Sequence, residues 1–152
     1  MAMHLTSSAF SHGSAIPARF TADGAGRSPP LTWADAPSRT RSFAMICRDP
    51  DARSGAFYHW ALYDIPAVMT GLEESCPSYD PEFRQARNDF GHIGYGGPNP
   101  PRGHGDHHYH FTLYALDVAN LGVAPGPASR AVEAAAKLHA LATADLIGTY
   151  ER

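Results

Sequence analysis

The chain has 152 residues and a formal net charge of −3 with neutral histidines, from 12 Lys and Arg against 15 Asp and Glu. This length suffices for one domain with a substantial core and is short for two, so residues 1–152 are predicted to form a single domain. The sequence has no run of basic residues, which argues against a nucleic-acid partner. It also has no apolar run long enough to form a transmembrane segment.

The first residues, MAMHLTSSAF, lack the charged region followed by an apolar stretch that marks a secretory signal. We therefore expect a cytoplasmic protein. Its two cysteines, Cys47 and Cys76, are then expected to be reduced thiols, because disulfides are rare in a reducing compartment.

The chain before residue 42 is predicted to form short extended segments between turns, because Gly and Pro recur there. The expected elements are a strand or arm at residues 1–10, an extended segment at 13–20, a loop at 21–30, a short strand at 31–33 and a turn at 35–41.

Two strong strands follow. Residues 42–48 (SFAMICR) are apolar almost throughout, which predicts a central strand covered on both faces. Residues 49–55 (DPDARSG) break it, and residues 57–65 (FYHWALYDI) form the next strand, which Pro66 ends. Strict alternation would place His59, Ala61, Tyr63 and Ile65 on one face of that strand. Residues 69–86 are irregular and are expected to include a short helical turn.

Residues 91–105 are too dense in Gly and Pro for helix or regular strand, which indicates a shaped loop with backbone N–H groups free to face a ligand. Residues 106–116 then read as a strand rich in aromatic and β-branched residues. Alternation divides this strand into one face with His107, Tyr109, Phe111 and Leu113, and another with His108, His110, Thr112 and Tyr114.

One helix is predicted at residues 129–140, where Ala is frequent and Ser129 is placed to cap the first turn. A final strand is expected at residues 144–150. Strands separated by tight turns, with a single late helix, are typical of a mainly β protein built as an antiparallel sandwich and not of a βαβ fold.

Three of the predicted strands meet polar breaks, and these breaks supply the candidate site. If the strand ends lie together, they gather Asp49, Asp51, His59, His107 and Tyr109 under the backbone of residues 96–101. Imidazole N–H, phenol O–H and loop amides are all donors. A carboxylate that accepts a hydrogen bond from an imidazole orients the ring and favours its charged form. The set suits a small anion, phosphate in particular.

Each residue or motif of the candidate site, taken alone, also has a purely structural interpretation. Asp-Pro-Asp is a common turn, and His59 and Tyr109 would be ordinary core residues with satisfied polar atoms. The run HGDHHYH suggests a metal site, but His107 and His108 point to opposite faces of a strand and cannot bind the same ion there. His108 and His110 share a face, but the sequence does not indicate a third ligand for them. No serine lies in a nucleophile-elbow context.

The chain resembles the phosphatidylethanolamine-binding protein family, specifically its shorter bacterial and archaeal branch of Raf kinase inhibitor-like proteins. The resemblance is carried by SSAF, IPARFTADG and SPPLTW within residues 7–33, SFAMICRDPDA at 42–52, HWALYDIP at 59–66, NDFGHIGYGGPNPPRGHGDHHYHFTLYALD at 88–117 and LIGTY at 146–150. The resemblance implies a Greek-key antiparallel β-sandwich with one small anion pocket. The implied ligand-binding residues are Asp49, Asp51, His59, Gly97, Pro98, Pro100, Pro101, His107 and Tyr109.

Two positions depart from the family pattern. The family usually reads DPDAP, whereas Arg53 stands in the place of the second proline and puts a cation near the rim of the pocket. Bacterial relatives often read GPCPP, whereas this chain has Asn99 in place of the cysteine. Thiol-based activity is therefore not expected at that position.

These observations favour a non-enzymatic binding protein for a phosphate-like group, either a phospholipid head group or a phosphorylated ligand, with no cofactor and no metal. The resemblance also implies a regulator of a protein kinase or protease, and leaves a homodimer open. Two alternatives remain. One is a hydrolase or phosphotransfer enzyme that uses Asp49 and Asp51 with His59 or His107. The other is a docking module whose pocket has lost its ligand.

Overall fold

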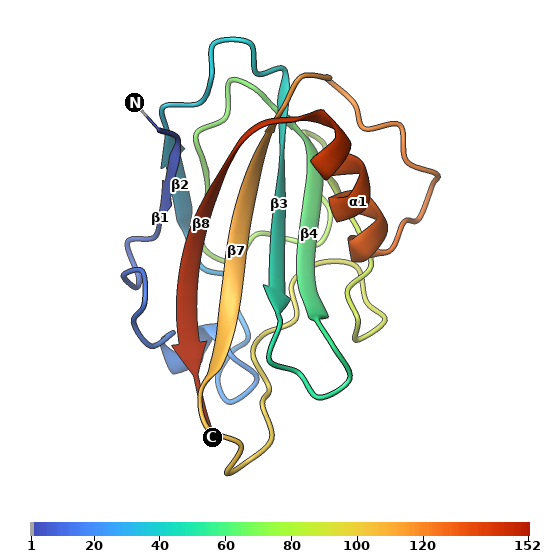
Figure 1. Ribbon diagram of the computed structural model, residues 1–152. Coiled ribbons are helices and arrows are strands. Elements are labelled where there is room, and N and C mark those ends of the chain that lie inside the picture. Colours follow the sequence, from blue (N-terminus) through green and yellow to red (C-terminus); the bar gives the residue numbers. More distant parts are fainter. Residues whose placement is uncertain (1) are drawn as a thin grey trace.

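The computed structural model describes residues 2–152, and it consists mainly of two antiparallel sheets (Figure 1). The larger sheet has the order β6-β4-β3-β7-β8. The smaller has the order β1-β2-β5. The strands are β1 (His4–Thr6), β2 (Leu31–Ala34), β3 (Ser42–Asp49), β4 (Phe57–Pro66), β5 (Gly71–Leu72), β6 (Arg84–Gln85), β7 (His107–Leu116) and β8 (Ala140–Tyr150). The helices are the short 3-10 helix η1 (Ala18–Phe20) and α1 (Ser129–His139).

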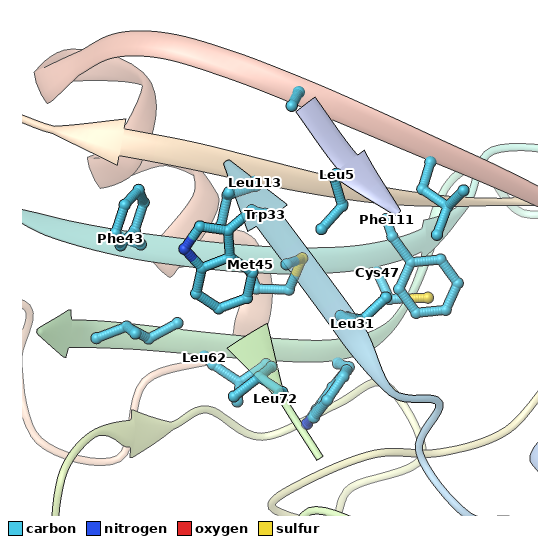
Figure 2. Close-up of a cluster of buried hydrophobic side chains, with 14 of the residues drawn as sticks. Leu5, Leu31, Trp33, Phe43, Met45, Cys47, Leu62, Leu72, Phe111 and Leu113 are labelled. Carbon is cyan, nitrogen blue, oxygen red and sulfur yellow. The ribbon is translucent and has the colours of Figure 1, made fainter. Parts of the chain in front are cut away.

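The two faces of the larger sheet bury different clusters. Its inner face packs against the smaller sheet, where Trp33 lies over Phe43 with ring centroids 5.5 Å apart (Figure 2). Its other face carries a second buried cluster with Val132 and Ala136 of α1. The central strand β3 is thus covered on both sides, as its apolar sequence predicts. The predicted mainly β sandwich with antiparallel strands and one late helix is confirmed.

The predicted face of β4 is wrong, because the strand contains two bulges. Phe43 pairs with Ile65 and Met45 with Leu62, so two residues of β4 lie opposite Ala44. Cys47 pairs with Trp60 and Arg48 with Tyr58, so a second register shift leaves His59 without a pairing partner on β3. A bulge changes which side the following residues face. His59 therefore packs on the inner side against Tyr109, whereas Ala61 and Tyr63 belong to the cluster under α1.

Other differences from the predicted elements have local causes. Residues 69–86 contain β5 and β6 and no helix, and the short helical segment is instead η1, inside a stretch expected to be extended. Strand β8 begins at Ala140, directly after α1, because it pairs with β7 along its whole length. Ser129 does not cap α1: its hydroxyl donates to the carbonyl of Arg87 at 2.8 Å. Met1, part of the expected first segment, lies outside the described residues.

A buried carboxylate holds α1 against the sheet. Glu133 is only 3% exposed, and it accepts hydrogen bonds from the hydroxyls of Tyr58 (2.5 Å) and Tyr114 (2.8 Å). The Arg48 guanidinium donates to the same carboxylate at 3.1 Å. A buried charge is tolerated only when its hydrogen bonds are made, and here three groups from β3, β4 and β7 make them.

We expect Glu133→Ala to lower the free energy of unfolding by about 3 kcal/mol, because it leaves two hydroxyls and a guanidinium without their acceptor. The matched control is Lys137→Ala, an exposed position one turn further along α1, which should change stability by less than about 0.5 kcal/mol. Urea unfolding followed by circular dichroism measures both. Equal losses in the two variants would contradict the role assigned to Glu133.

Candidate functional site

One end of the larger sheet carries a cavity of about 200 Å³. It opens where β3 ends, where β4 and β7 begin, and beside the loop that precedes β7, near the C-terminus at the bottom of Figure 1. The strand ends that the sequence predicted to meet therefore do meet. The predicted site residues that line the cavity are Asp49, His59, Pro100, Pro101, His107 and Tyr109.

The centre of the site is a buried pair, Asp49 and His107. The Asp49 carboxylate Oδ2 lies 2.5 Å from His107 Nδ1, and both residues are almost fully buried. The other carboxylate oxygen accepts the backbone N–H of Asp51 at 2.8 Å. Because the carboxylate is the acceptor, His107 Nδ1 carries a hydrogen, and its Nε2 is the nitrogen left to face a further partner.

Asp51 is not part of the cavity lining. Its half-exposed carboxylate turns outward and accepts both the backbone N–H and the Nδ1–H of His108, each at 2.8 Å. The two carboxylates of the Asp-Pro-Asp turn thus face different sides of β7, one toward His107 and one toward His108. Asp51 therefore links the turn to His108 and does not reach the cavity.

Gly97 and Pro98 also lie behind the cavity and not on its surface. The Pro98 carbonyl accepts the N–H of Ala22 at 2.9 Å. A Cβ atom at Gly97 would come within 2.8 Å of the Phe20 carbonyl oxygen, closer than real contacts allow. These residues therefore dock the loop against residues 20–22 and so position Pro100 and Pro101, which do line the cavity.

The ring of His59 is held by the loop that it faces. Its Nδ1 lies 2.6 Å from the Gly96 carbonyl, while the Gly96 N–H donates to the His59 carbonyl at 2.9 Å. A carbonyl only accepts, so Nδ1 carries the hydrogen. Burial lowers the pKa of His59, outweighing the hydrogen bond to Gly96 that raises it. The neutral ring has a lone pair on Nε2, so His59 donates to an anion from that atom only after it gains a proton.

The hydroxyl of Tyr109 is an unused donor. The residue is 1% exposed, and within residues 2–152 its buried hydroxyl has no hydrogen-bond partner. Burial raises the pKa of Tyr109, so the group stays a protonated phenol. An unsatisfied buried hydroxyl costs about 1–3 kcal/mol. The ring packs edge-on against His59, with centroids 5.3 Å apart.

The sequence reasoning missed His104. Its Nδ1 lies 2.6 Å from His107 Nε2, and the Nε–H of Arg53 points to its Nε2 at 3.4 Å. Read from the surface inward, Arg53, His104, His107 and Asp49 form one chain of hydrogen bonds. His104 stood in the run HGDHHYH, but its role depends on a loop conformation that no periodicity describes.

The side chains around the cavity include several hydrogen-bond donors. Within residues 2–152, no group of three or more His, Cys, Asp or Glu side chains is arranged to hold a metal ion. The same part of the chain contains no helix long and apolar enough to cross a bilayer. The cavity is lined by the buried Asp49–His107 pair, by two further imidazoles, by Tyr109 with its unpartnered hydroxyl, and by Pro100 and Pro101 of the loop.

The model of the phosphatidylethanolamine-binding protein family matches residues 6–151. A UPF0098 protein of Aquifex aeolicus is 46% identical, over 99% of this chain and 89% of its own length. The crystal structure of YbcL from E. coli, described as a new member of the mammalian family of these proteins, superposes with a TM-score of 0.94 at 31% identity and covers 100% of this chain and 99% of its own. The crystal structure of a homologue from Chlamydia trachomatis superposes with a TM-score of 0.88 at 39% identity. It covers 99% of this chain and 98% of its own. The chain belongs to the phosphatidylethanolamine-binding protein family.

Proposed function

We propose that this protein is a non-enzymatic, cytoplasmic binding protein, acting as one domain, that holds a small phosphate-like anion in the cavity. The observation that carries the proposal is the free, buried Tyr109 hydroxyl in a cavity that also contains His59 and His107. A buried donor without an acceptor indicates a site built for an acceptor that comes from outside the chain. Phosphate oxygens are strong acceptors.

Buried Asp49 limits how an anion can enter. A carboxylate beside the ligand repels it unless a proton is present between them. Because burial favours the neutral form of His59, an anion is expected to bind together with protons, which His59 and His107 accept at Nε2. In the bound state, we assign donor roles to His107 Nε2, to Tyr109 and to a protonated His59.

An enzyme that turns over phosphoesters is the second candidate, and the geometry favours it less. Within the described residues, no serine, threonine or cysteine lines the cavity. Cys47 is buried in the core, and burial raises the pKa of its thiol. Asp49 already accepts from His107 and from the Asp51 backbone, so it is poorly placed to act as a nucleophile or as a general base.

Regulation of a protein kinase or protease, and a homodimer, remain expectations that come from the family resemblance alone. A ligand-free docking module is distinguished from the binding protein by whether the cavity has a ligand at all. Measuring anion binding at the cavity therefore separates the two.

His107→Asn and His108→Asn form a matched pair, because each Asn keeps a donor for the carboxylate that its histidine contacts. We expect His107→Asn to weaken binding of inorganic phosphate about tenfold or more, since it removes Nε2 from the cavity. His108 lies outside the cavity lining, so His108→Asn should change affinity less than about twofold. Proton–nitrogen NMR titration measures both affinities and the residues that respond. Equal effects, or no saturable shifts around the cavity, would refute the anion site.

Affinity should also fall as pH rises. Burial keeps the pKa of His59 low in the empty site, and an adjacent anion favours the imidazolium, so binding takes up a proton. Between the pKa values of the free and the bound states, affinity then falls by up to about tenfold per pH unit for each proton taken up. Dimethyl phosphate, whose own charge is constant, is the probe between about pH 5.5 and 8.

The control for this titration is His59→Asn, which can still donate to the Gly96 carbonyl but does not titrate. We expect the pH dependence to flatten in this variant. A wild-type affinity that does not change with pH, or an equally steep dependence in His59→Asn, would show that His59 takes up no proton when the anion binds.

A further inference from the structure

We propose that Arg53 and His104 are specificity-determining residues that make this pocket prefer a terminal phosphomonoester to a phosphodiester head group. The proposal rests on the anion site proposed above and names the class of ligand that this site selects. Arg53 and His104 both lie at the rim of the cavity. Both line the cavity on the side away from the Asp49 carboxylate, since they extend the hydrogen-bond chain outward.

The Arg53 guanidinium is held at the rim without being neutralised there. Its Nε donates to His104 at 3.4 Å, a long contact, and within residues 2–152 no carboxylate lies within 4.0 Å of it. Arg152 provides the contrast. Its guanidinium reaches the cavity-lining Asn99 at 2.6 Å, but it is paired with the Asp23 carboxylate. The terminal donors of Arg53 are therefore available to a ligand.

His104 lies between two glycines that let it move. Gly103 and Gly105 have φ angles of +74° and +80°, and a side chain at either would meet nothing within 4 Å. His104 donates from Nδ1 to His107 Nε2. It thus occupies the position that a phosphate oxygen would take at His107, and a small rotation about the glycine pair frees both imidazoles to face the anion.

The charge of the ligand decides how much these two residues matter. A phosphomonoester carries about −1.5 to −2 at neutral pH, whereas a diester carries a single charge. The protons taken up by His59 and His107 offset the Asp49 carboxylate and a single charge on the ligand. The second charge of a monoester needs another cation, and Arg53 is the cation at the rim. A diester also lacks the third free oxygen that a rim donor would bind.

The size of the cavity agrees with a small phosphate group. Its volume of about 200 Å³ is below the range of about 300–1,000 Å³ typical of pockets for drug-sized ligands. The cavity can therefore enclose a phosphate and a short substituent. In a phospholipid such as phosphatidylethanolamine the phosphate is a diester, with substituents on two oxygens, so the rim would have to accommodate a second ester group in the place where Arg53 and His104 lie.

The test is a calorimetric titration of the full chain with methyl phosphate, dimethyl phosphate and glycerophosphoethanolamine, at neutral pH and equal ionic strength. We expect methyl phosphate to bind about tenfold more tightly than either diester. In Arg53→Ala, the affinity for methyl phosphate should fall about tenfold and that for dimethyl phosphate less than about threefold, so the preference disappears. His104→Ala should likewise reduce the ratio of the two affinities.

The matched control is Arg102→Ala. Arg102 is exposed in the loop that carries His104 but is not part of the cavity lining. The Arg102→Ala variant should therefore keep the preference for methyl phosphate. Loss of preference in Arg102→Ala, equal losses for both ligands in Arg53→Ala, or no preference in the wild type would overturn the assignment while leaving the anion site intact. If the wild type binds none of the three ligands, both the specificity proposal and the proposed function fail.

Discussion

The hydrogen bond between Asp49 and His107 is the interaction on which the site depends. It joins the end of β3 to the start of β7 across 58 positions of sequence, in surroundings where neither side chain is exposed to solvent. A carboxylate in such surroundings is stable only with its acceptor positions filled, and His107 together with the Asp51 amide fills them. The bond also orients the imidazole. It directs Nε2 toward His104, at the rim of the cavity.

The rest of the fold keeps the partners of this pair in place. The antiparallel register of β3 and β7 brings the two strand ends together, and a bulge in β4 adds His59 from the third strand. The Gly- and Pro-rich loop then closes over the site through reciprocal hydrogen bonds between His59 and Gly96. The network around Glu133 holds the opposite face of the same strands. Strands thus carry the inner part of the site, and a loop with positive-φ glycines on both sides of His104 carries part of its rim.

Alternation along β7 was enough to predict that His107 and Tyr109 face inward and His108 outward, because that strand is regular. The same rule failed in β4, where bulges at positions opposite Ala44 and at His59 change the facing side without any sequence signal. Alternation also could not predict the direction of the Asp51 side chain, because side chains in turns are oriented by local hydrogen bonds. The position of His104 was not predicted for a related reason. Glycines with positive φ define it, and a Gly-rich sequence is compatible with many loop conformations.

The central claim is that the outward nitrogen of His107 receives an anion, and ring-nitrogen NMR of imidazole-labelled protein tests it most directly. The account predicts that Nδ1 keeps its hydrogen, bonded to Asp49, whether the pocket is empty or occupied. It predicts that Nε2 changes on saturation with methyl phosphate, from the acceptor of a hydrogen bond from His104 to a protonated donor to the phosphate. Saturable binding that leaves the Nε2 resonance of His107 unchanged would contradict this account.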